Sequence, residues 1–297
     1  MNLQARQHAS EIDSLRRGLA DLAVDAQFAE DPGMEARYGP HGRRIWRTET
    51  ASRLEHLAEA VACEAPTMFA AHAHWAASAL RTRDVPEADV HAHVDALART
   101  LDAELPAPVA ARVKPFLDAA RAAIAVPCSH SRGLLEERGA DATLAKRFLL
   151  HLLQRERDAA DRIAMDALQG GMTIADVYER ILAPALAEVG RMWHMQEASI
   201  ADEHFCSAAV RELRGRLRAA VPAPPPDGRR ALCCAAGGDM HDLALRMAAD
   251  LLELDGWTVE FLGADLPETE ALAAVERDAD DPERAIQLVC IGARTQL

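Results

Sequence analysis

The chain has 297 residues, of which nearly half are apolar but only 4% are aromatic. This length predicts two or three domains, and the abundance of alanine favours packed helices over a β-sandwich. The net charge of −14 argues against general affinity for phosphate backbones, so we expect no direct nucleic-acid binding.

The N-terminus is polar and has no signal-peptide core, and no window approaches the run of about 18 apolar residues that a membrane helix needs. We therefore predict a cytoplasmic protein without a membrane span. The six cysteines show no spacing typical of zinc or disulfides. Cys233, Cys234 and Cys290 lie in strand-like runs and are predicted to be small buried hydrophobes.

Residues 1–130 predict an N-terminal helical domain. Apolar residues recur at helical spacing, and prolines stand near several predicted helix starts. A first apolar stripe contains Leu15, Leu19, Leu22 and Val24, and ends near the Asp-Pro-Gly turn at 31–33. Further helices are predicted over residues 48–63, 66–83, 87–105 and 108–125, after a loop reading RYGPHGRR.

Five histidines lie in these predicted helices: His56, His72, His74, His91 and His93. The two residues of each His-x-His pair point to different sides of a helix, so a pair does not readily bind one ion. We predict surface positions for them. The alternative is a second tetrapyrrole in this domain, with His56 or His72 as its axial ligand.

Residues 140–220 predict a second helical block, with helices over 143–167, 173–188 and 200–219. Gly170-Gly171 and the segment 190–197 are the predicted breaks. The stretch VPAPPPDGRR at 221–230 contains four prolines and predicts a semi-rigid linker.

The periodicity changes in residues 229–297, where three strand-like runs alternate with two helical runs. This order is typical of a parallel, Rossmann-like or flavodoxin-like sheet. The predicted fold class is therefore mainly α plus α/β. Three strands are about half of a usual sheet of this type, so we expect a truncated domain.

The turn after the first strand contains Asp239 and His241 two residues apart. Ligands of such sheets bind at the carboxyl ends of the strands, where this turn lies. A neutral imidazole there could bind a metal while the carboxylate holds its other ring nitrogen. The alternative is an ordinary residue at a helix start.

The stretch GDMHDLALRMAADLLELDGWTVEFLGADLP resembles the Asp-x-His-x-x-Gly corrinoid motif of cobalamin (B12)-binding domains, with its later Leu-Gly-x-x-x-Pro ending. The resemblance implies that His241 is the lower axial cobalt ligand and Asp239 its hydrogen-bonding partner. It also implies that Gly263 lies beside the cofactor, and Thr295 matches a later Ser-x-Leu element. Ala244 departs from the family, because glycine is expected there, and its methyl group narrows the channel for the nucleotide tail.

The helical block contains Trp193, nine further residues, and then Glu203-His204. This pattern is similar to the helical cap of CarH-type adenosylcobalamin photoreceptors. The resemblance implies that Trp193 packs against the adenosyl group, that Glu203 contacts it, and that His204 is the upper cobalt ligand after light. The resemblance covers about residues 140–297, and residues 1–125 lack the pattern of the family's basic DNA-binding domain. The N-terminal helices instead look like the helical region that precedes B12-binding domains in some bacterial sensor proteins, which implies a sensor or partner-binding role.

These observations predict a non-enzymatic, cobalamin-binding light sensor that signals through a protein partner or self-association. The resemblance also implies a role in transcription regulation. A corrinoid protein that carries methyl groups for a methyltransferase is the first alternative. Trp193 with Glu203-His204 favours the bulkier adenosyl ligand over methyl. The second alternative is a degenerate interaction module that no longer binds cobalamin.

Overall fold

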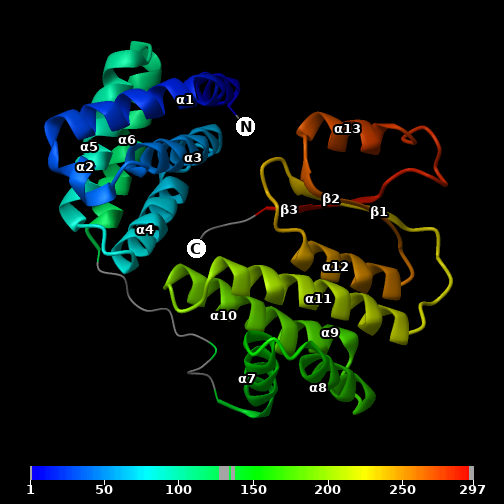
Figure 1. Ribbon diagram of the computed structural model, residues 1–297. Coiled ribbons are helices and arrows are strands. Elements are labelled where there is room, and N and C mark those ends of the chain that lie inside the picture. The colour runs from blue at the N-terminus through cyan, green and yellow to red at the C-terminus, as the bar shows by residue number, and fades with distance from the viewer. Residues whose placement is uncertain (1, 127–133, 135–137, 294–297) are drawn as a thin grey trace. The chain divides into compact units, whose positions relative to one another are not determined.

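The computed structural model describes residues 2–126, 134 and 138–293. Internal contacts divide the chain into an N-terminal unit, up to residue 129, and a C-terminal unit, from 130 to 295. The predicted limits of the individual domains stay a prediction. The fold class is confirmed, because helices dominate both units and the C-terminal one adds a small parallel sheet (Figure 1).

The described part of the N-terminal unit consists of helices. These are α1 (Leu3–Glu30), α2 (Gly33–Tyr38), α3 (Gly42–Ala62), α4 (Pro66–Thr82), α5 (Glu87–Glu104) and α6 (Ala107–Ile124). Proline stands at or beside the start of α4, α5 and α6, where its missing N–H costs no helical hydrogen bond. Their apolar faces form one core.

Two helix predictions in this unit are wrong in detail. Helix α3 begins at Gly42 and not near Thr48. Its first turns bury Trp46 against Val24 and Phe28 of α1. In α1, Leu15 and Leu22 are about half exposed. The buried face of α1 instead carries small residues such as Ala20 and Ala23, which let α3 approach closely.

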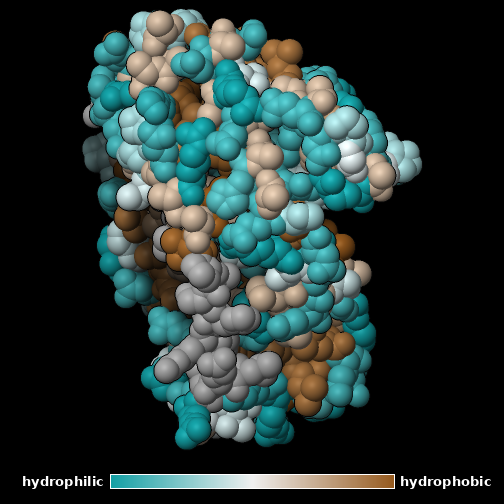
Figure 2. All heavy atoms as spheres, turned by 90° about the vertical axis from the view of Figure 1, so that its left-hand side faces the viewer, coloured by the Kyte–Doolittle hydropathy of each residue, from teal (hydrophilic) through white to brown (hydrophobic). Residues whose placement is uncertain are grey.

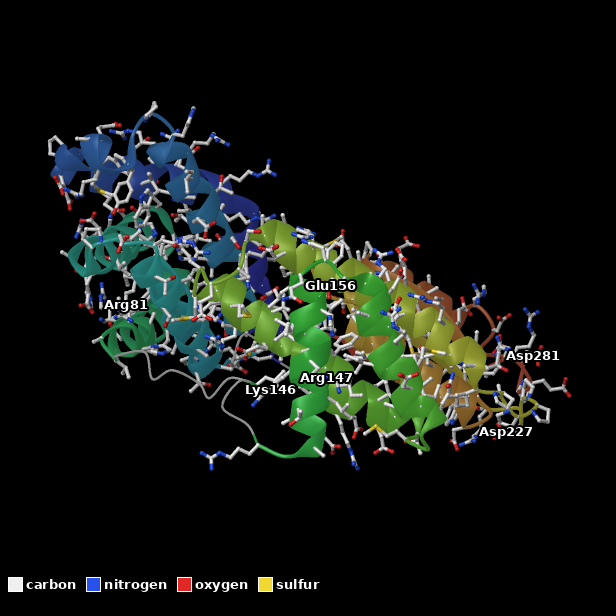
Figure 3. The ribbon with its side chains drawn as sticks, turned by 60° about the horizontal axis from the view of Figure 1, so that its bottom comes forward. Arg81, Lys146, Arg147, Glu156, Asp227 and Asp281 are labelled. Atoms are coloured by element: carbon white, nitrogen blue, oxygen red, sulfur yellow. The ribbon has the colours of Figure 1, made fainter. Side chains whose placement is uncertain are left out.

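The C-terminal unit starts with a helical bundle, which we call the cap. Its elements are α7 (Ala140–Leu153), α8 (Arg157–Gln169), α9 (Ile174–Val177), the π-helix η2 (Tyr178–Leu182), α10 (Ala183–His194) and α11 (Ile200–Ala220). The prediction of one helix over 143–167 is wrong, because Arg155 adopts a positive φ of 63° between α7 and α8. Figure 3 shows Glu156 at this corner and Lys146 and Arg147 earlier along α7.

The predicted break over 190–197 is also misplaced. Helix α10 continues through Gly190 to His194, and the chain turns only at Met195–Ser199. The π-helix before α10 has a covalent cause: Pro184 has no N–H, so the α-helical hydrogen-bond ladder is interrupted there. The chain therefore runs as one helical column from Ile174 to His194.

A three-stranded parallel sheet follows, in the order β2-β1-β3. Its elements are β1 (Arg230–Ala236), α12 (Leu243–Leu254), β2 (Thr258–Leu266), α13 (Glu268–Glu276) and β3 (Leu288–Gly292). The central strand β1 is almost wholly buried, including Cys233 and Cys234 as predicted, whereas Cys290 on the edge strand β3 is half-buried. Helices α12 and α13 lie on opposite sides of the sheet (Figure 1).

The cap and the sheet domain share a core. Met247 is buried in the cap's cluster of apolar residues, and Leu243, Leu251 and Leu254 of the same helix pack against that cluster. Helix α12 therefore lies between the sheet and the cap and fixes one against the other.

On the outside, hydrophilic residues cover most of the face shown in Figure 2. Within the described residues, no helix is long and apolar enough to cross a membrane.

Candidate cobalamin site

The turn between β1 and α12 holds His241 in a defined orientation. The Asp239 carboxylate accepts hydrogen bonds from the backbone N–H of His241 and from its ring: Oδ1 lies 2.8 Å from both N and Nδ1. With the proton on Nδ1, the imidazole presents the lone pair of Nε2, which is the form that binds a metal. The side chain of His241 is 60% exposed and that of Asp239 only 10%.

The turn is itself braced by the end of β2. Asp265 accepts a hydrogen bond from the N–H of Gly238 at 2.7 Å, and the N–H of Asp265 donates to the carbonyl oxygen of Asp239 at 2.9 Å. Asp265 lies in the Leu-Gly-Ala-Asp-Leu-Pro stretch, so the two parts of the predicted motif are hydrogen-bonded to each other. No local sequence pattern marked Asp265 as a site residue.

Ala244 and Gly263 also lie near this edge of the sheet. Ala244 is exposed in the first turn of α12, so its methyl group points away from the packed core. Gly263 has a φ of 87° and pairs with Cys234, and a Cβ added there would meet no atom within 4 Å. Gly263 therefore serves the backbone conformation of β2 and leaves open space above it. Thr295 lies outside the described residues.

Trp193, Glu203 and His204 lie together at one corner of the cap. Trp193 is in the last turn of α10, and Glu203 and His204 are in the first turns of α11. Ser199 caps α11 by a reciprocal pair of hydrogen bonds with Asp202, which fixes the direction of the helix after the turn. Trp193 and Glu203 are half-buried and His204 is exposed. Glu203 also accepts a hydrogen bond of 2.7 Å from the Ser207 hydroxyl.

Ion pairs show how α11 lies along α12. Arg211 of α11 contacts Asp242, the residue after His241, at 2.7 Å, and Arg218 contacts Glu253 at 3.2 Å. The two helices therefore run in the same direction, with their N-termini at the end where the strands finish (Figure 1). His204 precedes Arg211 by two helical turns, about 10 Å along the axis. The corner with Trp193 thus extends past the His241 turn.

A buried polar cluster connects the same elements. Asp250 of α12 is fully buried, accepts a hydrogen bond of 2.7 Å from the Tyr178 hydroxyl, and forms an ion pair of 2.5 Å with Arg214 of α11. Burial and the neighbouring carboxylate raise the pKa of Tyr178, so its hydroxyl stays protonated. This cluster was not predicted from the sequence. The sequence feature that could have revealed it is a carboxylate, Asp250, on the apolar face of α12, one turn after Met247.

The residues present fit a corrinoid. His241 is the residue that would hold the cobalt of a corrinoid, because its imidazole is exposed and has one ring nitrogen oriented by Asp239. Among the described residues no group of three or more His, Cys, Asp or Glu side chains could hold a bare metal ion. The open space over Gly263 lies at the same edge of the sheet.

Comparison with known proteins identifies the helical part of this region. Residues 144–218, within α7–α11, match the family model of a B12 binding domain. Over 126 residues, the chain is 35% identical to the HTH-type transcriptional repressor CarA of Myxococcus xanthus, which covers 42% of this chain. The chain spans 41% of the length of that relative.

Two solved structures are similar in outline. The Methanosarcina barkeri monomethylamine corrinoid protein has 17% identity and a TM-score of 0.42, over 46% of this chain and 65% of its own. The methanol:cobalamin methyltransferase complex MtaBC from Methanosarcina barkeri has 22% identity and a TM-score of 0.31, over 52% and 60%. The family match is confined to residues 144–218, which are similar to a B12 binding domain.

Proposed function

We propose that the C-terminal unit binds cobalamin between the cap and the carboxyl edge of the sheet, with His241 as the lower axial ligand. The observation that carries this proposal is the exposed His241 imidazole whose Nδ1 is held by Asp239 at 2.8 Å. The B12-binding family match of the adjoining cap helices supports it. Asp239 keeps the ring in one tautomer and raises the basicity of Nε2.

We further propose that adenosylcobalamin is the preferred form and that the protein senses light. When bound, this cofactor would supply a light-labile cobalt–carbon bond. Trp193 and Glu203 are the proposed contacts of the adenosyl group, and His204 is the proposed upper ligand after light. A half-buried Trp193 beside an exposed His204 gives the cap corner one apolar and one coordinating group for this purpose.

The cap is the proposed moving element. Its corner with Trp193 extends past the sheet, whereas its middle is fixed to α12 through Asp250 and Met247. The cap would have two conformations, one for each light state of the cofactor. A cofactor that binds one conformation more tightly would shift the cap's equilibrium toward that conformation. The similarity to a transcriptional repressor supports an output in transcription, exerted through a protein partner or self-association because the acidic chain disfavours DNA.

The test is reconstitution of the full chain with adenosylcobalamin in the dark, followed by gel filtration and illumination with green light. We expect a coloured protein whose visible spectrum changes on illumination and stays unchanged in the dark. A His204→Ala variant should bind in the dark as the wild type does but give a different spectrum after light. A dark spectrum that does not respond to light would remove the sensing role and leave the binding proposal intact.

Reconstitution of the full chain also tests the alternative function, a protein that carries methyl groups for a methyltransferase. If methylcobalamin were retained more tightly than adenosylcobalamin, the carrier function would replace the sensor. The second tetrapyrrole in the N-terminal unit stays a prediction. His72 is buried there and stacks on His56 at 3.9 Å between ring centroids, so an axial role for either ring would require this pair to separate.

A further inference from the structure

A small cavity lies inside the N-terminal unit, enclosed by side chains of α3, α4, α5 and α6. Its volume is about 30 Å³, which leaves room for roughly two water-sized groups. Alanine, leucine and valine side chains form most of its wall, and the polar side chains among the described lining residues are Arg53, His72, His93 and the indole of Trp46. No carboxylate is among these lining residues.

Arg53 is the unusual member of this set. Its side chain is only 12% exposed, and its Nη1 is buried without a hydrogen-bond partner among the residues that the structure describes. Its Nη2 lies 3.8 Å from the carboxylate of Glu49, whose own side chain is 58% exposed. Burial lowers the pKa of the Arg53 guanidinium, because the charged form has lost water without gaining a close anion.

The neighbouring His93 gives Arg53 no acceptor either. Both ring nitrogens of His93 are occupied: Nε2 lies 3.1 Å from the Thr50 hydroxyl and Nδ1 lies 2.8 Å from Oε1 of Gln27. Burial lowers the pKa of His93 to about 3, so the ring is neutral at physiological pH. Trp46 packs on its face with ring centroids 4.9 Å apart. The cavity therefore contains a cation, neutral polar groups and apolar walls.

These properties select a ligand class. A carboxylate matches the planar fork of a guanidinium and forms charge-assisted hydrogen bonds with it. Apolar walls favour a small alkyl group on that carboxylate, and a volume of about 30 Å³ limits the whole ligand to the size of formate or acetate. Inorganic phosphate is disfavoured, because a single guanidinium would leave part of its charge buried and unpaired.

We propose that this cavity binds a carboxylate of one or two carbons, formate or acetate, with the carboxylate on Arg53 and the methyl group of acetate among the alanine and leucine side chains. The proposal is independent of the cobalamin site, since every residue that it uses lies between Trp46 and Ile124. It gives the N-terminal unit a metabolite-sensing role of its own.

The first experiment compares formate and acetate with formamide and acetamide by calorimetric titration of the full-length wild-type protein. The amides have nearly the same shape but no charge. We expect saturable binding of at least one carboxylate, at least about tenfold tighter than its amide. Absence of saturable binding, or equal affinities for acid and amide, would overturn the proposal.

The second experiment uses variants of one helix. Arg53→Met removes the charge and keeps an unbranched side chain, and Arg44→Met makes the same change at an exposed position of α3. We expect the carboxylate affinity to fall at least about tenfold in Arg53→Met and to stay at the wild-type value in Arg44→Met. Retained affinity in a folded Arg53→Met protein would contradict the assignment. If that variant does not fold, the acid–amide comparison on the wild type decides.

Discussion

The two units contain histidines in opposite environments, and His93 and His241 show this most clearly. His93 is 3% exposed and both of its ring nitrogens have partners inside the N-terminal unit. His241 has one nitrogen held by Asp239 and is 60% exposed at the edge of a sheet. The same side chain thus serves packing in one unit and is exposed at the edge of a sheet in the other. Buried polar residues should therefore control stability, and the exposed pair should control binding.

The largest expected effect on stability is at Asp250 in the C-terminal unit. Asp250→Ala leaves the Arg214 guanidinium and the Tyr178 hydroxyl without their shared partner. Loss of one member of a buried pair costs about 3 to 5 kcal/mol. We expect that decrease in the free energy of unfolding, measured by urea denaturation.

The matched control is Asp166→Ala, which removes an exposed carboxylate from α8 of the same unit. It should change the free energy of unfolding by no more than about 0.5 kcal/mol. Equal effects of the two substitutions would show that the buried cluster does not hold the cap on α12.

The next effect is the pH dependence that arises from His93. Its pKa is about 3 in the folded protein because of burial, whereas an exposed histidine has a pKa of about 6.5. The unfolded state therefore takes up a proton first as the pH falls, and stability from this residue is lost between about pH 6.5 and pH 3. The maximum slope is about 1.4 kcal/mol per pH unit.

Comparison of the wild type with His93→Gln isolates this contribution from the carboxylates that titrate over the same range. Below about pH 6.5, the reference pKa of histidine, the free energy of unfolding should fall more steeply with decreasing pH in the wild type than in His93→Gln. Parallel pH profiles would mean that His93 does not stay neutral in the folded state.

Gly263→Ala should give a smaller loss. The φ of 87° at Gly263 is strained for any residue with a Cβ, although no atom within 4 Å would clash with one. We expect a decrease of about 1 to 2 kcal/mol in the free energy of unfolding. Thermal denaturation followed by circular dichroism measures it, and an unchanged stability would argue against the positive φ.

Ala244→Gly should give the smallest effect. The methyl group of Ala244 is exposed, so its removal costs only the helical preference of alanine, about 0.5 to 1 kcal/mol. Cobalamin affinity should remain that of the wild type. A marked increase in affinity would show that this methyl group does narrow the channel for the nucleotide tail.

The sequence predicted the elements well where local signals were strong. The Pro-marked starts of α4 and α5 and the capped α11 lie within one or two residues of the predicted limits. The split of 143–167 at Arg155 was missed because neither Gly nor Pro marks that turn. The break over 190–197 was placed too early because Gly190 was interpreted as a helix end, although the helix tolerates it.

The site was predicted less completely. The Asp239–His241 pair could be inferred because its residues are close in the sequence and their chemistry is distinctive. Asp265 and Arg211 could not, since each acts on the turn across 26 or more residues through a contact that no local pattern encodes. The surface positions predicted for His72 and His93 are wrong for the same reason, because their burial results from packing between helices.

The most direct test of the account is the affinity of the full chain for adenosylcobalamin in the dark, with and without the His241 imidazole. We predict that His241→Ala lowers this affinity at least about tenfold, while its free energy of unfolding changes by no more than about 0.5 kcal/mol. His91→Ala, a half-exposed histidine of the N-terminal unit, should leave both quantities unchanged. Wild-type affinity and an unaltered visible spectrum in a folded His241→Ala protein would contradict the account.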